Sequence, residues 1–231
     1  MLMSFRGLLD ERRTAGAAAG AFTCYDVTSA LGVVQAAEAC NVPVMFLVAE
    51  ASLRAPSGRL LLPALLAVGD AARVPVCVQL DHVADDALVD EALAGGIGAV
   101  MADGSKLPED ENASFVAATG CDCLAVSIGN VHGHYAAPPQ LDWDRLAAIR
   151  EHVHVPLSLH GASGLPDDDV RRAIALGISK VNVNTELRER YLAQLEAGLP
   201  AARDGLRLLA LQAGVIDAVA AVVAARLAVL G

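Results

Sequence analysis

Residues 76–104 read VCVQLDHVADDALVDEALAGGIGAVMADG, and the order of patterns in this stretch decides the fold. The apolar run 76–80 has the length and β-branched content of a buried strand, and a second apolar run covers 99–102. Between them, residues 85–94 have helical spacing and end at Gly95-Gly96, because glycine favours the end of a helix. A strand, a helix and a strand in that order predict two parallel strands joined by a crossover helix.

The same alternation runs through the whole chain. We predict seven strands, at residues 21–24, 43–48, 76–80, 99–102, 124–128, 157–159 and 181–183. Predicted helices cover 8–19, 28–40, 60–72, 85–94, 110–118, 143–151 and 166–176, and the chain after residue 185. Thr28 or Ser29 is expected to cap the second of these helices, and Asp142 the sixth.

This pattern predicts an α/β fold with a parallel sheet and helices outside it. No segment rich in Pro, Gly or Ser divides the chain, so we interpret residues 1–231 as one domain. The fold expected is a (β/α)8 TIM barrel, which needs eight strands and about 250 residues. With seven recognisable strands, the chain is one strand–helix unit short.

Composition narrows the class of protein. The 231 residues include 27 acidic and 17 basic side chains, a formal net charge of −10, and 55% are hydrophobic. A disordered chain is therefore excluded, and the negative charge argues against a nucleic-acid partner. The five cysteines are odd in number and stand mostly in apolar runs, which indicates reduced thiols in a cytoplasmic protein. We expect no signal peptide and no membrane-spanning run of about 20 apolar residues.

Polar residues gather where the predicted strands end. His82, His132 and His160 each follow a different strand, and parallel strands in a barrel bring these ends to one face, where active sites lie. Three histidines that converge in this way could hold a catalytic zinc ion with one position left open. The alternative is that each histidine only makes a hydrogen bond in its loop. His152 and His154 precede a strand, so we expect them on the opposite face.

Two loops are suited to bind an anion. Residues 161–164 read GASG just before the helix that opens at Pro166, and residues 182–185 read NVNT just before the last helical segment. Small residues before a helix N-terminus let backbone N–H groups face an anion. Loops after the last two strands are the common phosphate site of such barrels. Taken alone, either stretch is equally typical of an ordinary tight turn.

Five motifs together resemble the class II, zinc-dependent ketose-bisphosphate aldolases, and most closely their tagatose/fructose-bisphosphate branch. The motifs are VQLDH at 78–82, DGS at 103–105, GNVHG at 129–133, LHGASG at 159–164 and KVNVNTE at 180–186. They stand in family order over nearly the whole chain. The resemblance implies Zn²⁺ held by His82, His132 and His160, with Asp81 as proton donor. It implies that dihydroxyacetone phosphate binds at Gly133, Gly161, Ala162, Ser163, Asn182, Val183, Asn184 and Thr185.

The activity that the resemblance implies is reversible aldol cleavage of a phosphorylated ketose to dihydroxyacetone phosphate and an aldehyde, within carbohydrate metabolism such as glycolysis. Zinc would polarise the ketone, and Asp81 would pass a proton to or from the new hydroxyl. Asp81 could instead only orient the site. Family members are homodimers or homotetramers, and the apolar segment 206–230 has too few charges for a solvated helix, which favours an interface.

The chain departs from the family at three places. The strand that carries a Val-Glu-Ala-Glu motif with catalytic carboxylates is absent, since DGS at 103–105 runs directly through EDEN at 109–112 into AATG at 117–120. We expect a break in the barrel wall there, and Glu109, Asp110 or Glu111 would have to supply the lost carboxylate. Thr23 stands where the family has Asn, and Ala49-Glu50 where it has Ser or Thr.

Three other functions stay open. The lost unit could leave a catalytically inactive protein that only binds metal or phosphate. The histidines could activate water in a metal-dependent hydrolase, although the phosphate loops fit this less well. A Schiff-base aldolase needs a buried lysine at a strand's C-terminal end. The two lysines are Lys106, which we expect in a loop, and Lys180, which we expect to begin its strand.

Overall fold

The computed structural model describes residues 1–102, 116–117, 119–133, 135 and 137–231. Its strands are β1 (Ala19–Thr23), β2 (Val44–Ala49), β3 (Val76–Val83), β4 (Ala99–Ala102), β5 (Leu124–Val126), β6 (Leu157–Leu159) and β7 (Ile178–Val183). Its helices are α1 (Phe5–Thr14), α2 (Val27–Cys40), α3 (Glu50–Leu53), α4 (Gly58–Ala71), α5 (Asp86–Ala94), α7 (Trp143–His152), α8 (Asp167–Ala175), α9 (Thr185–Gly205) and α10 (Leu208–Leu230). The predicted helix at 110–118 falls mostly outside the described residues.

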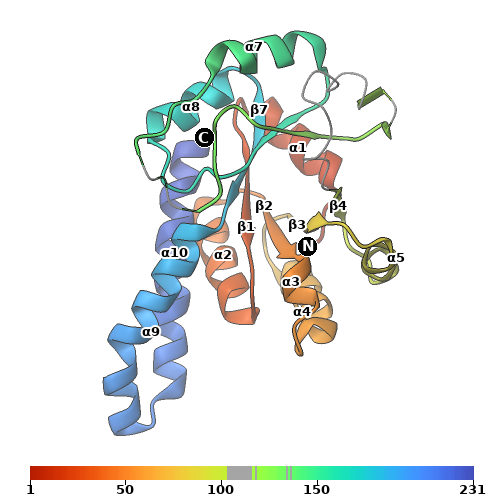
Figure 1. Cartoon of the computed structure of the whole chain (residues 1–231). Coiled ribbons are helices and arrows are strands. Elements are labelled where there is room, and N and C mark those ends of the chain that lie inside the picture. Colours follow the sequence, from red (N-terminus) through yellow and green to blue (C-terminus); the bar gives the residue numbers. More distant parts are fainter. Residues whose placement is uncertain (103–115, 118, 134, 136) are drawn as a thin grey trace.

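The strands are parallel and form one sheet in the order β4-β3-β2-β1-β7-β6-β5. The sheet curls into a half-barrel, with helices along its outer side (Figure 1). Within the residues that the structure describes, β4 and β5 are the two edges and do not pair with each other. All seven predicted strands are present, and the residues between β4 and β5, where the break was predicted, fall largely outside the described part of the chain.

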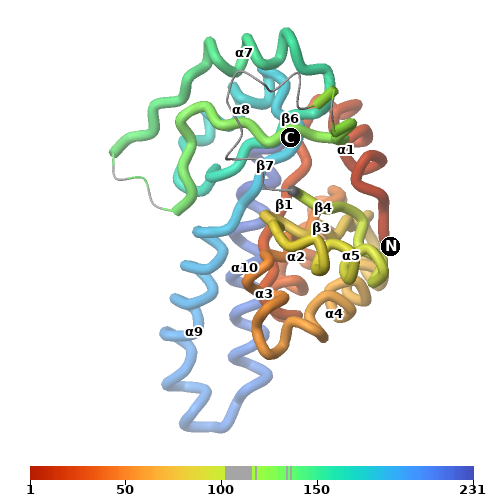
Figure 2. The backbone as a smooth tube through the Cα atoms, turned by 45° about the vertical axis from the view of Figure 1, so that its right-hand side comes forward, coloured from red at the N-terminus to blue at the C-terminus, as the bar shows by residue number. Residues whose placement is uncertain are grey.

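The inside of the curled sheet is filled by small and apolar side chains. Leu8 and Leu9 of α1 are almost fully buried, so α1 closes the end of the half-barrel at which the strands begin (Figure 2). They pack on the inward-facing residues Ala19, Ala21, Met45, Leu47 and Cys77. Because α1 fills the inside of the half-barrel at this end, the interior of the sheet opens at the opposite end, where the strands finish.

Helix α10 lies against α2 and β1, and with α9 it forms a helical hairpin that extends away from the sheet (Figures 1 and 2). A side chain at Gly32 would meet Val219 at 2.7 Å, so glycine is what allows the close approach of α2 and α10. Among the described helices, α10 alone is long and apolar enough to cross a membrane. One face of its second half is buried in the core, and Arg226 Nε lies 2.7 Å from the Glu186 carboxylate, so this half of the helix packs on the rest of the protein.

Two details of the sequence interpretation are wrong. Asp26 caps α2, because its carboxylate accepts the Ser29 N–H at 2.7 Å, while Ser29 lies inside the first turn and its Oγ accepts the Asp26 N–H at 3.1 Å. Lys180 does not begin its strand: it is the third residue of β7 and only 1% exposed. The Asp142 cap of α7 is confirmed, since its carboxylate accepts the Arg145 N–H at 2.9 Å.

Candidate functional site

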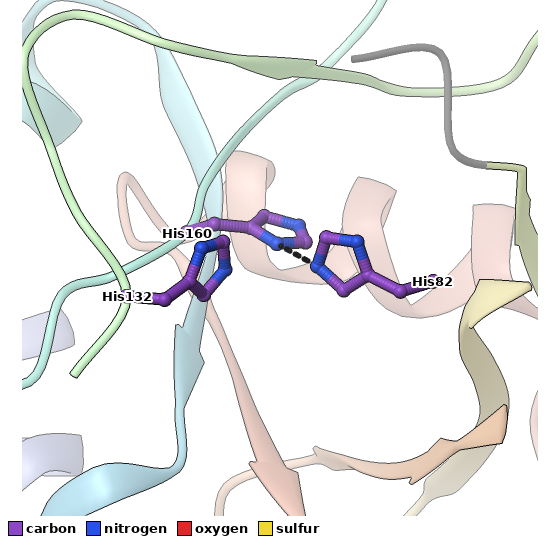
Figure 3. Close-up of side chains that lie close together, drawn as sticks. All are labelled: His82, His132 and His160. Atoms are coloured by element: carbon purple, nitrogen blue, oxygen red, sulfur yellow. Dashed lines mark hydrogen bonds between the residues drawn. The ribbon is translucent and has the colours of Figure 1, made fainter. Parts of the chain in front are cut away.

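Three histidines face one another at the C-terminal ends of the strands (Figure 3). His82 comes from β3, His132 from the loop after β5, and His160 from the loop after β6. One ligand nitrogen from each ring lies within 4.8 Å of the other two, and Nε2 of His82 is 3.0 Å from Nδ1 of His160. His160 is buried and His132 is exposed, so the cluster is shielded on the His160 side and open to solvent on the His132 side.

This cluster fits a zinc ion. Imidazole nitrogen is a preferred zinc ligand at about 2.0–2.1 Å, and catalytic zinc sites use three protein ligands and leave the fourth position open. Nitrogens bound at that distance in a tetrahedron lie roughly 3.3 Å apart, close to the spacing of the His82 and His160 nitrogens. The rings lie nearly perpendicular to one another, with centroids 4.9–5.7 Å apart, so they are not stacked face to face.

The backbone at His82 explains how this ring reaches the cluster. His82 has a φ of 53°, in the left-handed region, and the pairing of β3 with β4 shifts register between Leu80 and Val83. Neighbouring residues in a regular strand point to opposite faces, yet both Asp81 and His82 contact residues of the site. The irregularity turns His82 toward the same side as Asp81, at a cost of about 1–2 kcal/mol for a residue with a Cβ.

Asp81 lies below the histidines and is 7% exposed. Its carboxylate accepts a hydrogen bond from Gln79 Nε2 at 3.2 Å, and Asn182 Nδ2 lies 3.5 Å from both of its oxygens. The same Asn182 amide lies 3.2 Å from Nε2 of His160. Asp81, Asn182 and His160 are therefore one connected group, drawn from β3, β7 and the loop after β6.

Lys180 supports this group from inside the sheet. Its ammonium donates to Asn182 Oδ1, which turns the Asn182 amide nitrogen toward Asp81 and His160. Burial lowers the pKa of Lys180, and the negative charge of Asp81 opposes that shift. Lys180 is the third of the six residues of β7 rather than at its C-terminal end, and its ammonium is engaged with Asn182, which argues against Schiff-base chemistry.

The two loops that carry His132 and His160 are braced against each other. Asn130 Nδ2 donates to the His160 carbonyl at 3.0 Å. Tyr135 OH donates to the Gly161 carbonyl at 3.0 Å and accepts the Val131 N–H at 3.3 Å. At Gly161, with a φ of 60°, a Cβ would lie 2.2 Å from the Val131 carbonyl oxygen. Glycine therefore lets the two backbones touch, and this contact fixes the spacing of the two histidines.

The predicted anion loops lie beside this cluster. Ser163 Oγ accepts the Asn184 N–H at 3.4 Å, which joins the loop after β6 to the start of α9. Asn184 precedes α9 and, among the described residues, makes no side-chain cap, although its Oδ1 accepts a hydrogen bond from Tyr25 OH at 2.9 Å. The first N–H groups of this 21-residue helix, beginning at Thr185, are thus directed at the site without a cap.

The remaining predicted substrate-binding residues differ in which of their groups could contact a ligand. Ala162 and Val183 are buried with their side chains in the main hydrophobic core, so only their backbone groups could face a ligand. Gly133 follows His132 and has a φ of 93°, which suits glycine. Helix α8 begins at Asp167, and its first turn holds three aspartates, which makes it a poorer anion site than α9.

The structure brings together all twelve predicted site residues at one end of the half-barrel, in or directly after β3, β5, β6 and β7. His152 ends α7, and His154 precedes β6 beside α1, at the other end. Asp103, Lys106, the 109–111 carboxylates and His134 lie outside the described residues. Sequence reasoning missed Asn130 and Tyr135 as supports, because each acts through a contact between distant segments. It also missed Lys180, which it placed at the start of the strand.

A sequence model of the family described as "Fructose-bisphosphate aldolase class-II" matches residues 3–115 and 113–231. The two matches meet where the sequence predicts the missing unit. Among curated relatives, "Uncharacterized protein YdjI" of Escherichia coli K12 is 46% identical over 114 residues, 49% of this chain and 38% of that protein. "D-tagatose-1,6-bisphosphate aldolase subunit GatY" of Klebsiella oxytoca is 40% identical over 162 residues, 50% of this chain and 57% of that protein. The chain thus spans about half the length of these relatives or less.

Solved structures match the whole fold. The crystal structure of the YdjI aldolase from Escherichia coli K12 has a TM-score of 0.91 at 28% identity, covering 100% of this chain and 98% of that one. A fructose-1,6-bisphosphate aldolase from Coccidioides immitis, described as putative, has a TM-score of 0.84 at 26% identity, with 97% and 94% covered. Fructose-bisphosphate aldolase from Campylobacter jejuni, at 17% identity and a TM-score of 0.79 over 99% and 95%, shows the fold alone.

Proposed function

The chain belongs to the class-II fructose-bisphosphate aldolase family, and from that premise we propose that it is a zinc-dependent aldolase. It cleaves a phosphorylated ketose reversibly to dihydroxyacetone phosphate and an aldehyde, in carbohydrate metabolism. The observation that carries the proposal is the juxtaposition of three histidine ligands with the buried carboxylate of Asp81 through Asn182. A metal site alone would fit many reactions, but a buried carboxylate beside it provides the proton transfer that an aldol reaction needs.

His82, His132 and His160 would hold the zinc ion, which when bound supplies a Lewis acid that polarises a carbonyl. Asp81 takes the proton from the substrate hydroxyl as the carbon–carbon bond breaks, and returns it to the alkoxide oxygen in the condensation direction. Asn182 and Gln79 hold the Asp81 carboxylate in place for that transfer. The base that moves the carbon-bound proton would come from residues 109–111, outside the described part of the chain.

The phosphate would bind between the 161–163 loop and the N-terminus of α9. Backbone N–H groups at Gly161 to Ser163 and at Thr185 onward provide positive partial charge without a basic side chain. This suits a chain with a net charge of −10. The Ser163–Asn184 hydrogen bond holds the two halves of this anion site together, and Gly133 would contribute a third backbone group beside the metal.

A retro-aldol assay combined with metal analysis tests the proposal. The purified protein is expected to carry one Zn²⁺ per chain and to release triose phosphate from fructose or tagatose 1,6-bisphosphate. A chelator should abolish that activity, and added zinc should restore it. His160→Ala should lose zinc and activity together. Elemental analysis without metal after zinc add-back would refute the metal centre.

The absence of the Val-Glu-Ala-Glu motif from the sequence favours one second candidate, a catalytically inactive protein that binds zinc and phosphate. The carboxylates of the missing unit are part of the family's machinery, so turnover could have been lost with it. A protein that binds zinc and dihydroxyacetone phosphate, but neither cleaves ketose bisphosphates nor exchanges the triose carbon-bound proton with solvent, would establish this candidate.

We also propose that residues 1–231 are a single domain that assembles as a homodimer or homotetramer. The α9–α10 hairpin carries large exposed apolar side chains, Leu192, Leu199, Leu206, Leu208 and Leu209. Large exposed apolar side chains gathered on one hairpin are typical of an interface. All five cysteines are thiols, which supports a place in the cytoplasm.

A further inference from the structure

We propose that Glu50 is a positioning residue for the candidate metal centre: with Arg54, it pins the backbone just beyond His82 and so keeps the His82 ring turned toward His160. The inference rests on the proposed role of His82 as a metal ligand. It concerns a residue outside the predicted set, in the place where the family has Ser or Thr. Glu50 follows β2 and is the first residue of α3.

Glu50 uses both carboxylate oxygens. Oε2 accepts the Ala84 backbone N–H at 2.9 Å, two residues after His82, and Oε1 accepts Arg54 Nε at 2.8 Å. Arg54 also donates through Nη2 to Asp85 Oδ2 at 2.6 Å. Asp85 in turn caps α5, since its Oδ1 accepts the Ala87 N–H at 2.9 Å. The end of β2, the chain after His82 and the start of α5 are thereby tied to one another.

This tie acts on the segment that most needs one. His82 holds a left-handed φ of 53°, and β3 loses its regular register at this point. Such a conformation persists only when its surroundings fix it. The pairing of β3 with β4 shifts register between Leu80 and Val83, and its pairing with β2 ends at Asp81, so neither neighbour holds His82 itself. The Ala84–Glu50 hydrogen bond supplies the missing restraint. Without it, the backbone can relax toward regular strand geometry, which turns the His82 ring away from Asp81's side of the strand.

The electrostatics agree with this role. The Ala84 N–H and the Arg54 guanidinium lower the pKa of Glu50, in that order of effect, so the carboxylate stays charged at neutral pH. A charged acceptor makes a stronger hydrogen bond to a backbone N–H than a neutral one. Glu50 is 22% exposed and Arg54 is 53% exposed, so the pair lies at the rim and its removal leaves no buried charge without a partner.

The chain contains a matched control. The Glu38 carboxylate accepts the Arg73 backbone N–H at 2.8 Å and Arg73 Nε at 2.8 Å. This pair has the same chemistry as Glu50 with Ala84 and Arg54, and Glu38 has a similar exposure of 16%. It joins the end of α2 to the segment before β3, at the opposite end of that strand from His82. Removing it therefore tests the loss of an equivalent ion pair without touching the metal centre.

The test measures zinc affinity by competition with a chromogenic chelator, for the full chain and for Glu50→Ala, Glu50→Gln and Glu38→Ala. We expect Glu50→Ala to bind zinc at least about tenfold more weakly, the usual effect of removing a residue that orients a ligand. Glu50→Gln keeps an acceptor for Ala84 and should stay within about threefold of the native protein, and Glu38→Ala within about twofold. The cobalt-substituted Glu50→Ala protein should show an altered visible spectrum.

Native zinc affinity in Glu50→Ala, or an equal loss in Glu38→Ala, would overturn the inference. Should Glu50→Ala fail to fold, as judged by circular dichroism of the metal-free protein, Arg54→Met gives the answer. This variant keeps the hydrogen bond from the Ala84 N–H to the Glu50 carboxylate but removes the Arg54 guanidinium that holds that carboxylate. We expect zinc affinity to fall about threefold, and an unchanged zinc affinity would again overturn the inference. If the native protein itself binds no zinc, the proposed function fails. If the native protein binds zinc and the variants bind it equally well, only the inference about Glu50 fails.

Discussion

Replacing Gly161 by Ala should disrupt the metal centre through the backbone alone, without removing any ligand. The added Cβ would lie 2.2 Å from the Val131 carbonyl oxygen and 2.7 Å from its carbon. Both are backbone atoms, so neither can move aside as a flexible side chain would. The 130–133 loop must therefore shift as a unit, and His132 moves away from His160 with it.

The size of the effect follows from two terms. The φ of 60° at residue 161 costs a residue with a Cβ about 1–2 kcal/mol. Forcing packed backbones apart costs typically about 1–3 kcal/mol more. The loss in unfolding free energy should thus be about 2–5 kcal/mol, and zinc affinity should fall by at least about tenfold because ligand spacing is disturbed.

Gly96→Ala is the control for this experiment. Gly96 has a φ of 90° after α5, and a Cβ there meets no other described atom within 4 Å. It should lose about 1–2 kcal/mol from backbone conformation alone and keep native zinc affinity. Urea unfolding gives the stability of both variants, and chelator competition gives their zinc affinity. A Gly161→Ala protein that matches Gly96→Ala in both measurements would refute the reasoning about the braced loops.

The remaining predictions concern catalysis, thiol chemistry and assembly. Asp81→Ala should lower kcat by roughly 10²–10⁴-fold while zinc binding changes little, since a general acid acts in the transition state; steady-state kinetics with metal analysis checks this. Burial raises the pKa of Cys24 and raises that of Cys77 to about 12, so neither thiol should react with a thiol reagent at pH 8 in the folded protein, while exposed Cys40 reacts at once. Because their folded pKa values lie above the unfolded value, both thiols contribute stability below about pH 9, and it is lost as pH rises toward 12. Leu209→Glu should shift the mass measured by light scattering from an oligomer toward the monomer, and an unchanged mass would exclude that end of the hairpin from the interface.

The fold could be predicted from the sequence because its strands are continuous apolar runs between helical segments, and all seven are present. The histidine cluster was predictable for the same reason, since strand ends converge in a parallel sheet. The start of β7 could not be predicted from the sequence, because lysine is usually exposed and Lys180 was therefore placed at one end of the strand rather than inside it. The buried ammonium of Lys180 is compensated by Asn182 in the same strand and by the charge of Asp81, which lies far away in the chain.

The irregular backbone at His82 was equally out of reach. Nothing in the sequence around residue 82 distinguishes a left-handed φ from regular strand geometry, since histidine occurs in both. The restraint comes from Glu50, 32 residues earlier in the numbering and across a different strand. Local patterns therefore predict which residues reach the site, whereas their orientation depends on hydrogen bonds between distant segments.

The open edge of the sheet has a consequence for how the protein behaves in solution. A closed barrel has no strand edges, whereas here, among the described strands, β4 and β5 end the sheet and can template pairing with another chain. His82 stands on β3, beside one edge, and His132 follows β5, the other edge. A metal ion bound by both histidines would link the two edges of the sheet. Loss of the ion would remove this link between the described edges, so we expect metal depletion to promote association of the protein through them.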